Sequence, residues 1–304
     1  MSVAAPRPAA TLAGAMPWVF VLIWSTGFVV ARFGMPHAPP FSFLAMRFAL
    51  SLTCFLVWIA LAGVEWPRTA SQWTHLAVVG MLLHAGYLGG VWAAVKSGIG
   101  AGTVALIVGL QPVLTALWIT WSGAGPDTAS DGARVTARQW LGLGLGLGGL
   151  ALVVWHKLGG GEVTPANLAF AVVGLLAITA GTLYQKRFVA ACDVRTASAI
   201  QLFAALAVTL PLAMLETEPV VWHPHLIGAM AWSVLVLTLG GSSLLYLLIQ
   251  RGAATRVTSL MYLVPPCTAV LAWALFGEAF TWSIVMGLLM TVSGVAMVVR
   301  STTR

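Results

Sequence analysis

Long apolar stretches separated by short polar connections run through the whole chain. Each stretch has about 20 residues, the length that a helix needs to cross the hydrocarbon core of a bilayer. We expect transmembrane helices at 14–34, 41–63, 74–96, 102–122, 139–156, 166–186, 195–215, 226–249, 255–276 and 281–299. The stretches lack the alternation over about 10 residues that a membrane β-strand requires. The pattern therefore predicts an all-α membrane protein with ten transmembrane helices.

Composition agrees with this pattern. Of the 304 residues, 60% are hydrophobic and only 8% are charged, against about 25% charged residues in soluble domains. The longest connection has 16 residues, at 123–138, so we expect no separate soluble domain. Cys54, Cys192 and Cys267 are odd in number and lie in or beside apolar stretches, which is typical of packing residues. We expect neither a cofactor nor a metal site.

The net charge of +7 is distributed unevenly between the connections. Counted alternately from the N-terminus, one side carries Arg7, Arg68, Arg134, Arg138, Lys186, Arg187, Arg195, Arg251, Arg256, Arg300 and Arg304. The other side carries only Arg32, Lys96 and Lys157. Because basic residues are retained in the cytoplasm, this bias predicts a multi-pass protein of a bacterial inner membrane with both termini cytoplasmic. The basic charge thus reflects topology, and we expect no nucleic-acid partner.

The two halves of the chain are related. A shift of 154 residues aligns four helices without a gap, and Gly27/Gly181, Gly86/Gly240 and Pro112/Pro266 are among the matches. A shift of 145 then aligns GLALVV (149–154) with GVAMVV (294–299). We expect a first repeat at 12–156 and a second at 157–300. Five spans per repeat place the second in the opposite orientation, which is an inverted-topology repeat.

Prolines interrupt the fourth span of each repeat. Pro112 in the first half and Pro265 and Pro266 in the second each remove a backbone donor and disturb the helix. The freed carbonyls can remain in a membrane only where they face protein or a wet cavity. Simple kinks are the alternative, but the matched positions favour helix breaks beside a midplane cavity, as alternating access needs.

These features resemble a known family. GLQPVLTALW (109–118), YLVPPCTAVLAWALFGE (262–278) and the glycine-rich closing helices look like those of the drug/metabolite transporter superfamily, EamA type, and WSTGF (24–28) resembles the branch that exports aromatic amino acids. The resemblance covers essentially the whole chain. It implies an inner-membrane exporter of small metabolites, often amino acids, with its cavity between the first four helices of each half.

Polar groups in the middle of a span are costly and therefore candidates for function. All eight acidic residues lie outside the spans or at their edges, and His84 is the ionisable group nearest a span midpoint. It either titrates or binds substrate, or it is a neutral histidine bonded to a carbonyl. Trp24 is either a stacking wall or a core residue. The predicted substrate-binding residues are Trp24, Ser25, His84, Tyr87, Gln111, Tyr246 and Tyr262.

Arg47 lies about two turns inside the second span. It suits a substrate carboxylate, but we favour a structural role, which leaves an expected cavity with aromatic faces, neutral polar groups and no fixed charge. GLGLGLGG (142–149) spaces small residues for close helix contact. We interpret it as packing between the closing helices of the halves, with dimerisation as the alternative to a monomer.

The expected function is export of a small metabolite, most of all an amino acid with an apolar or aromatic side chain, by alternating access. A cationic drug would require a membrane carboxylate, and a sugar phosphate would require several basic residues. An importer, an uncoupled facilitator or a drug efflux carrier of the same fold remains the alternative. A membrane enzyme is disfavoured, because no acid lies within a span and no HExxH motif exists.

Overall fold

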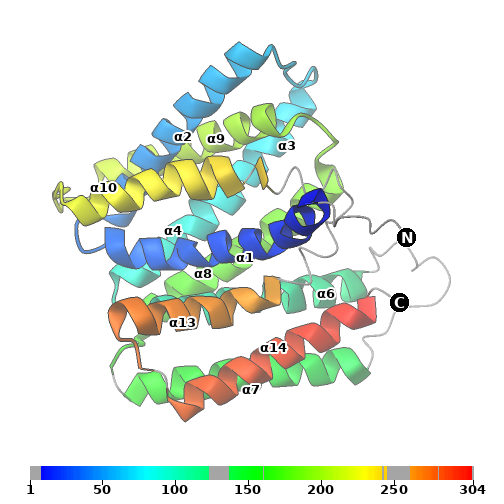
Figure 1. Ribbon diagram of the computed structural model, residues 1–304, viewed down its shortest axis with the longest axis vertical. Coiled ribbons are helices and arrows are strands. Elements are labelled where there is room, and N and C mark those ends of the chain that lie inside the picture. The colour runs from blue at the N-terminus through cyan, green and yellow to red at the C-terminus, as the bar shows by residue number, and fades with distance from the viewer. Residues whose placement is uncertain are drawn as a thin grey trace, which may run out of the picture.

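The computed structural model describes residues 8–122, 137–159, 161–241, 243–244, 261–279 and 281–302. Within these ranges the regular structure is entirely helical (Figure 1). The first half contains α1 (Pro8–Gly34), α2 (Pro40–Ala62), α3 (Ala70–Gly80), η1 (Met81–Gly86), α4 (Tyr87–Lys96), α5 (Ala101–Val108), α6 (Gln111–Ser122) and α7 (Ala137–Gly159). The second half contains α8 (Pro165–Phe188), α9 (Val194–Met214), α10 (Pro224–Ala231), η2 (Trp232–Gly240), η3 (Met261–Leu263), α13 (Val264–Phe276) and α14 (Trp282–Thr302).

These elements form ten spans, as predicted. The segment α3–η1–α4 is one continuous span, α5 and α6 form another, and α10 continues into η2. Among the described residues, six spans are long and apolar enough to cross a membrane by themselves. The last residues of the predicted span 226–249 and the first of 255–276 lie outside the described residues. The chain is therefore an all-α membrane protein.

Local sequence explains where the helices begin and end. Proline occupies the first turn of α2, α8 and α10, where a missing backbone donor costs nothing. Thr164 caps α8 in a reciprocal pair with Asn167. Gly63 and Gly277 end α2 and α13 with φ of 60° and 65°, a left-handed conformation that glycine adopts without strain.

Helices at matched positions of the two repeats pack against each other. The contacting pairs of this kind are α2 with α9, α5 with α13, and α7 with α14. In addition, the first span of each repeat packs against the third span of the other: α1 contacts α10 and η2, and α8 contacts α4. The start of α1 and the end of α14 lie at the same end of the bundle (Figure 1). We call this end the terminal end and the opposite one the far end. The arrangement is that of two intertwined five-helix repeats.

The closing helices α7 and α14 lie side by side at one edge of the molecule (Figure 1). A Cβ atom added to Gly149 would lie 2.4 Å from the Gly287 carbonyl oxygen, and one added to Gly294 would lie 2.4 Å from that of Gly142. Backbone therefore meets backbone along this seam, where Gly149 and Gly294 leave no room for a side chain. The packing interpretation of GLGLGLGG is confirmed for Gly142 and Gly149.

Two π-helical segments occupy matched positions in the third span of each repeat. η1 ends at Gly86 and η2 at Gly240, which are 154 residues apart. In η2 the Thr238 hydroxyl donates to the Ser233 carbonyl five residues earlier, at 2.8 Å. Such widened turns displace a side chain from its usual helical face and frequently occur at functional sites. The sequence analysis did not predict them.

Candidate functional site

A cavity of about 410 Å³ lies at the centre of the bundle between the two repeats. Its residues come from both halves and from six of the spans that pack around the molecular centre, together with Gln111 at the start of α6 and Met261 in η3. The lining reaches Gln185 near the end of α8 and Val194 at the start of α9, both at the terminal end. The cavity therefore extends from the middle of the bundle toward the end that carries the chain termini.

Equivalent positions of the repeats face each other across this cavity. Six pairs of lining residues are separated by the repeat distance of 154: Trp24/Ile178, Phe28/Thr182, Arg47/Gln201, Leu83/Leu237, His84/Thr238 and Tyr87/Gly241. The cavity thus lies where the pseudo-symmetry of the halves brings the same surfaces together. Secondary transporters place their substrate sites at such a position.

The first half contributes a charge that the sequence analysis did not expect in the cavity. Arg47 lines the cavity while only 7% exposed, and its guanidinium donates to the Thr238 hydroxyl at 3.2 Å. No carboxylate pairs with it among the described residues. The prediction of a cavity without fixed charge was therefore wrong. Because the described hydrogen-bond partner of the Arg47 guanidinium is a neutral hydroxyl, its buried positive charge and its other N–H groups can bind an anionic group.

His84 and Tyr87 line the cavity beside Arg47. His84 comes from η1, where Phe48 meets its ring edge-on at 5.9 Å between centroids and Gln201 lies within hydrogen-bonding reach. Tyr87 follows at the start of α4 and is 6% exposed. The π-helical turn thus places an imidazole and a phenol in the same wall as the guanidinium.

Trp24 lines the cavity from α1, half-buried and tilted against Phe20 at 5.5 Å between centroids. Its neighbour Ser25 does not line it. Ser25 is fully buried, its hydroxyl donates to the Val21 carbonyl at 2.8 Å, and its own carbonyl accepts from Thr268. The structure places Ser25 in the contact between α1 and α13, because a serine within a helix can bond to the preceding turn.

Gln111 stands at the helix break of the first half. Its Nε2 donates to the Thr182 hydroxyl at 3.1 Å, so the break contacts α8 across the cavity. α5 ends at Val108 and Pro112 is the second residue of α6. Pro265 likewise is the second residue of α13, after the short turn η3, and Pro266 follows it. A Cβ at Gly109 would lie 2.7 Å from Pro265, so the two breaks meet.

Two predicted residues cannot be placed in this site. Tyr246 and the side chain of Tyr262 lie outside the described residues. The cavity also contains polar residues that the sequence analysis did not single out, namely Thr182, Gln185, Ser198, Gln201 and Thr238. Carrying the repeat distance from Arg47 and His84 to Gln201 and Thr238 would have found two of them.

The far end of the bundle is closed by contacts between the repeats. Glu216 accepts the backbone N–H groups of Phe41 and Ser42 at the start of α2, at 2.9 and 2.7 Å. Glu218 pairs with Lys96 at the end of α4. Negative groups at a helix start are stabilised by its exposed N–H groups and dipole. The loop between α9 and α10 is thus fixed onto the first half.

The start of α5 receives two further carboxylates. Glu162 accepts the Gly100 N–H and Glu278 accepts the Ala101 N–H, both at 2.9 Å. A Cβ at Gly100 would lie 2.6 Å from both carboxylates, so a larger residue there would displace the two glutamate side chains. All four far-end acids therefore come from the second half and bind the first.

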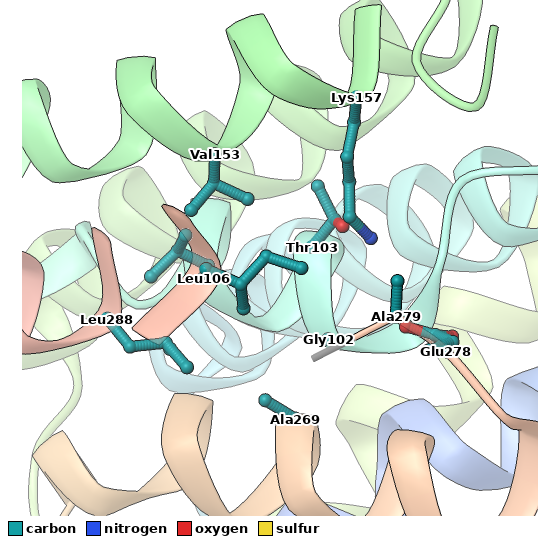
Figure 2. A pocket seen from close by; sticks show the side chains of 10 residues that line it. Gly102, Thr103, Leu106, Val153, Lys157, Ala269, Glu278, Ala279 and Leu288 are labelled. Atoms are coloured by element: carbon teal, nitrogen blue, oxygen red, sulfur yellow. The ribbon is translucent and has the colours of Figure 1, made fainter. Parts of the chain in front are cut away.

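A second, small cavity lies next to this contact (Figure 2). Its volume is about 20 Å³, room for roughly one water molecule. Lys157 points from α7 toward Thr103 on α5, with Glu278 beside the same helix start. Lys157 pairs with Glu162 at 2.7 Å. This region is a structural contact between the repeats, and the larger cavity is the candidate substrate site.

A central cavity between paired helical repeats in an all-α membrane protein defines a membrane transporter. The chain belongs to the EamA-like transporter family, whose model matches residues 15–155 and again 166–300. It is thus a transporter and not an enzyme.

Similar proteins agree with this assignment. The chain is 24% identical to the uncharacterized inner membrane transporter YedA of Escherichia coli K12 (86% of this chain, 81% of YedA) and 25% identical to the uncharacterized transporter YvbV of Bacillus subtilis 168 (91% and 88%). It is 22% identical to a probable amino-acid metabolite efflux pump of Salmonella typhimurium LT2 (92% of each). One crystal structure, 19% identical, has the same fold with a TM-score of 0.62 over 96% of this chain and 99% of that one.

Proposed function

We propose that the protein exports a small metabolite that carries a carboxylate, most of all an amino acid with an apolar or aromatic side chain, across a bacterial inner membrane. The observation that carries this proposal is Arg47, a guanidinium in the cavity wall whose described partner is the Thr238 hydroxyl. A substrate carboxylate would supply the missing negative charge and accept two parallel N–H bonds.

The rest of the lining suits the other parts of an amino acid. The ring faces of Trp24 and Tyr87 attract both an aromatic side chain and an ammonium group. The side-chain oxygens of Gln111 and Gln201 can accept hydrogen bonds from the ammonium. A volume of about 410 Å³ lies within the usual range of small-molecule sites, roughly 300–1,000 Å³.

No acidic residue lines the cavity among the described residues. This favours a second candidate substrate, a small carboxylic acid without an amino group. It disfavours a cationic drug, which would meet Arg47 without a counter-charge. The alternative of drug efflux is thereby weakened.

The side from which substrate enters in this conformation follows from which end of the cavity is accessible. The lining extends toward the terminal end, and the far end is closed by four carboxylate contacts. With both termini in the cytoplasm, as the basic residues predict, this conformation would load substrate from the cytoplasm. Alternating access then requires the far-end contacts to open and the terminal end to close. An importer or an uncoupled facilitator would use the same two conformations.

The test is counterflow of a labelled aromatic amino acid in proteoliposomes that contain the purified protein. Competitors should include aromatic and aliphatic amino acids, their decarboxylated amines, their deaminated acids and quaternary ammonium compounds. We expect the amino acids to compete and the amines to fail, because the amines lack the group that Arg47 binds. Competition by the amines or by quaternary ammonium compounds alone would overturn the proposal, and competition by the deaminated acids alone would establish the second candidate.

A further inference from the structure

Three histidines meet at the far end of the bundle, outside the substrate cavity. His37 lies in the loop between α1 and α2, and His223 and His225 flank Pro224 at the start of α10. One potential ligand nitrogen of each lies within 4.8 Å of the others. The first histidine belongs to the first repeat and the other two to the second. A ligand shared by all three would therefore connect the repeats.

Neighbouring contacts hold the three rings in place. The Val221 backbone N–H donates to the His37 carbonyl at 2.8 Å, which ties the two loops together. The rings of His37 and His223 stack at 4.3 Å between centroids, and His225 meets Phe33 edge-on at 5.5 Å. The cluster thus arises from a backbone contact between the repeats together with ring packing. It is not a chance meeting of flexible surface side chains.

We propose that His37, His223 and His225 bind one transition-metal ion, for which zinc is the representative, and that the ion links the two repeats at the far end. Neutral imidazole is a preferred ligand of zinc, copper and nickel, whereas calcium and magnesium prefer oxygen. Three histidines with a water at the fourth position form a common zinc arrangement. The exposed His225 leaves a path for the ion.

Charge and protonation are compatible with a metal at this position. Partial burial and the neighbouring His223, His225 and Lys96 hold the pKa of His37 below its usual 6.5. A lowered pKa favours the neutral imidazole that a metal ligand requires. Lys96 would repel a cation, but it is paired with Glu218.

Binding requires a modest rearrangement. Nitrogens bound to one zinc at about 2.0–2.1 Å lie roughly 3.4 Å apart in a tetrahedral site, so the rings must rotate toward one another. Nδ1 of His223 now accepts the His225 N–H at 3.2 Å, a long bond that a metal at this imidazole would replace. The stacked ring pair would open in the same movement. These are side-chain rotations, and the loop backbone can remain in place.

The experiment is titration of zinc into tag-free purified protein, followed by calorimetry and thermal unfolding. We expect one bound zinc per chain and a rise of several degrees in Tm, with no effect of magnesium. His37→Gln and His225→Gln, one from each repeat, should each abolish both effects, while His75→Gln, which alters a histidine at the terminal end, should retain them.

Unfolding without zinc shows whether each variant is folded, so loss of structure is distinguished from loss of a ligand. Unchanged zinc binding in both variants would overturn the site. Zinc that binds without raising Tm in the wild-type protein would overturn the link between the repeats.

Discussion

The two walls of the central cavity are built on the same backbone but carry different chemistry. At matched positions the first half presents Trp24, Phe28, Arg47, His84 and Tyr87, and the second half presents Ile178, Thr182, Gln201, Thr238 and Gly241. The first wall is aromatic and cationic, and the second is smaller and neutral. We expect the pseudo-symmetry to allow the two conformations of alternating access, and the divergence between the repeats to give the substrate one defined orientation.

The largest expected effect comes from a substitution that gives both cavity walls the same residue at the matched positions 47 and 201. Arg47→Gln reproduces the residue at Gln201 and removes the charge that we assign to the substrate carboxylate. Truncating one partner of a buried charge pair typically costs about 2–5 kcal/mol, so counterflow should fall by at least roughly thirtyfold.

The control is Gln201→Ala in the opposite wall, for which we expect a loss of about 1 kcal/mol. Thermal unfolding should show that Arg47→Gln is as stable as the wild-type protein or more stable, because an uncompensated buried charge is gone. Equal losses of counterflow in the two variants would mean that the walls are equivalent.

The next effect concerns the pair His84 and Thr238. Among the titratable side chains of the cavity, histidine is the residue type whose unperturbed pKa lies between pH 5 and 8. His84→Gln should therefore remove most of the pH dependence of transport between about pH 5 and 8, measured as initial counterflow rates at several pH values. Thr238→Val keeps the imidazole and should leave the shape of the pH profile unchanged. A pH profile that survives His84→Gln would place proton coupling elsewhere.

A smaller, substrate-dependent effect is expected at Trp24. If its indole is a stacking wall, Trp24→Ala should weaken the binding of aromatic amino acids by about 1–2 kcal/mol relative to aliphatic ones, as measured by competition constants. Ile178→Ala, at the matched position, should reduce both classes equally. If Trp24→Ala weakens the binding of aromatic and aliphatic amino acids equally, Trp24 is a packing residue and not a stacking surface.

The smallest effect is expected where the walls contact each other. Thr182→Val removes the hydroxyl that accepts from Gln111 at 3.1 Å but keeps the shape of the side chain. We expect a loss of about 0.5–1.5 kcal/mol in substrate binding, the net contribution of one hydrogen bond. Thr179→Val, whose hydroxyl bonds within α8 to the Leu175 carbonyl, is the matched control and should bind substrate normally.

Much of the fold could be predicted because membrane spans follow from length and apolarity alone. The helix breaks at Pro112 and Pro265 could be predicted as well, since a missing N–H acts locally. The π-helical segments could not, because they depend on how η1 and η2 pack against neighbouring spans. The widened helical turns around His84 and Thr238 were therefore outside the reach of pattern analysis.

The candidate site, too, could be predicted only in part from the sequence. The cost of placing polar side chains in the middle of a membrane span predicted Trp24, His84, Tyr87 and Gln111 as site residues, and all four line the cavity. It failed for Ser25, because a hydroxyl can be satisfied by its own helix. Arg47 was misjudged for another reason: depth within a span does not tell whether a long side chain extends to the membrane surface or turns toward the centre.

The far-end acids have a consequence for how this protein can change over time. Glu162, Glu216 and Glu278 each bind backbone N–H groups of the first half, and every residue except proline provides such a group. At Glu216 these backbone contacts thus have a single replaceable partner, the carboxylate. Substitutions other than proline at Phe41 or Ser42 leave the two backbone bonds in place, whereas a change at Glu216 removes them. We therefore expect that a single substitution at Glu216 can tune the balance between the two conformations without a compensating change on α2.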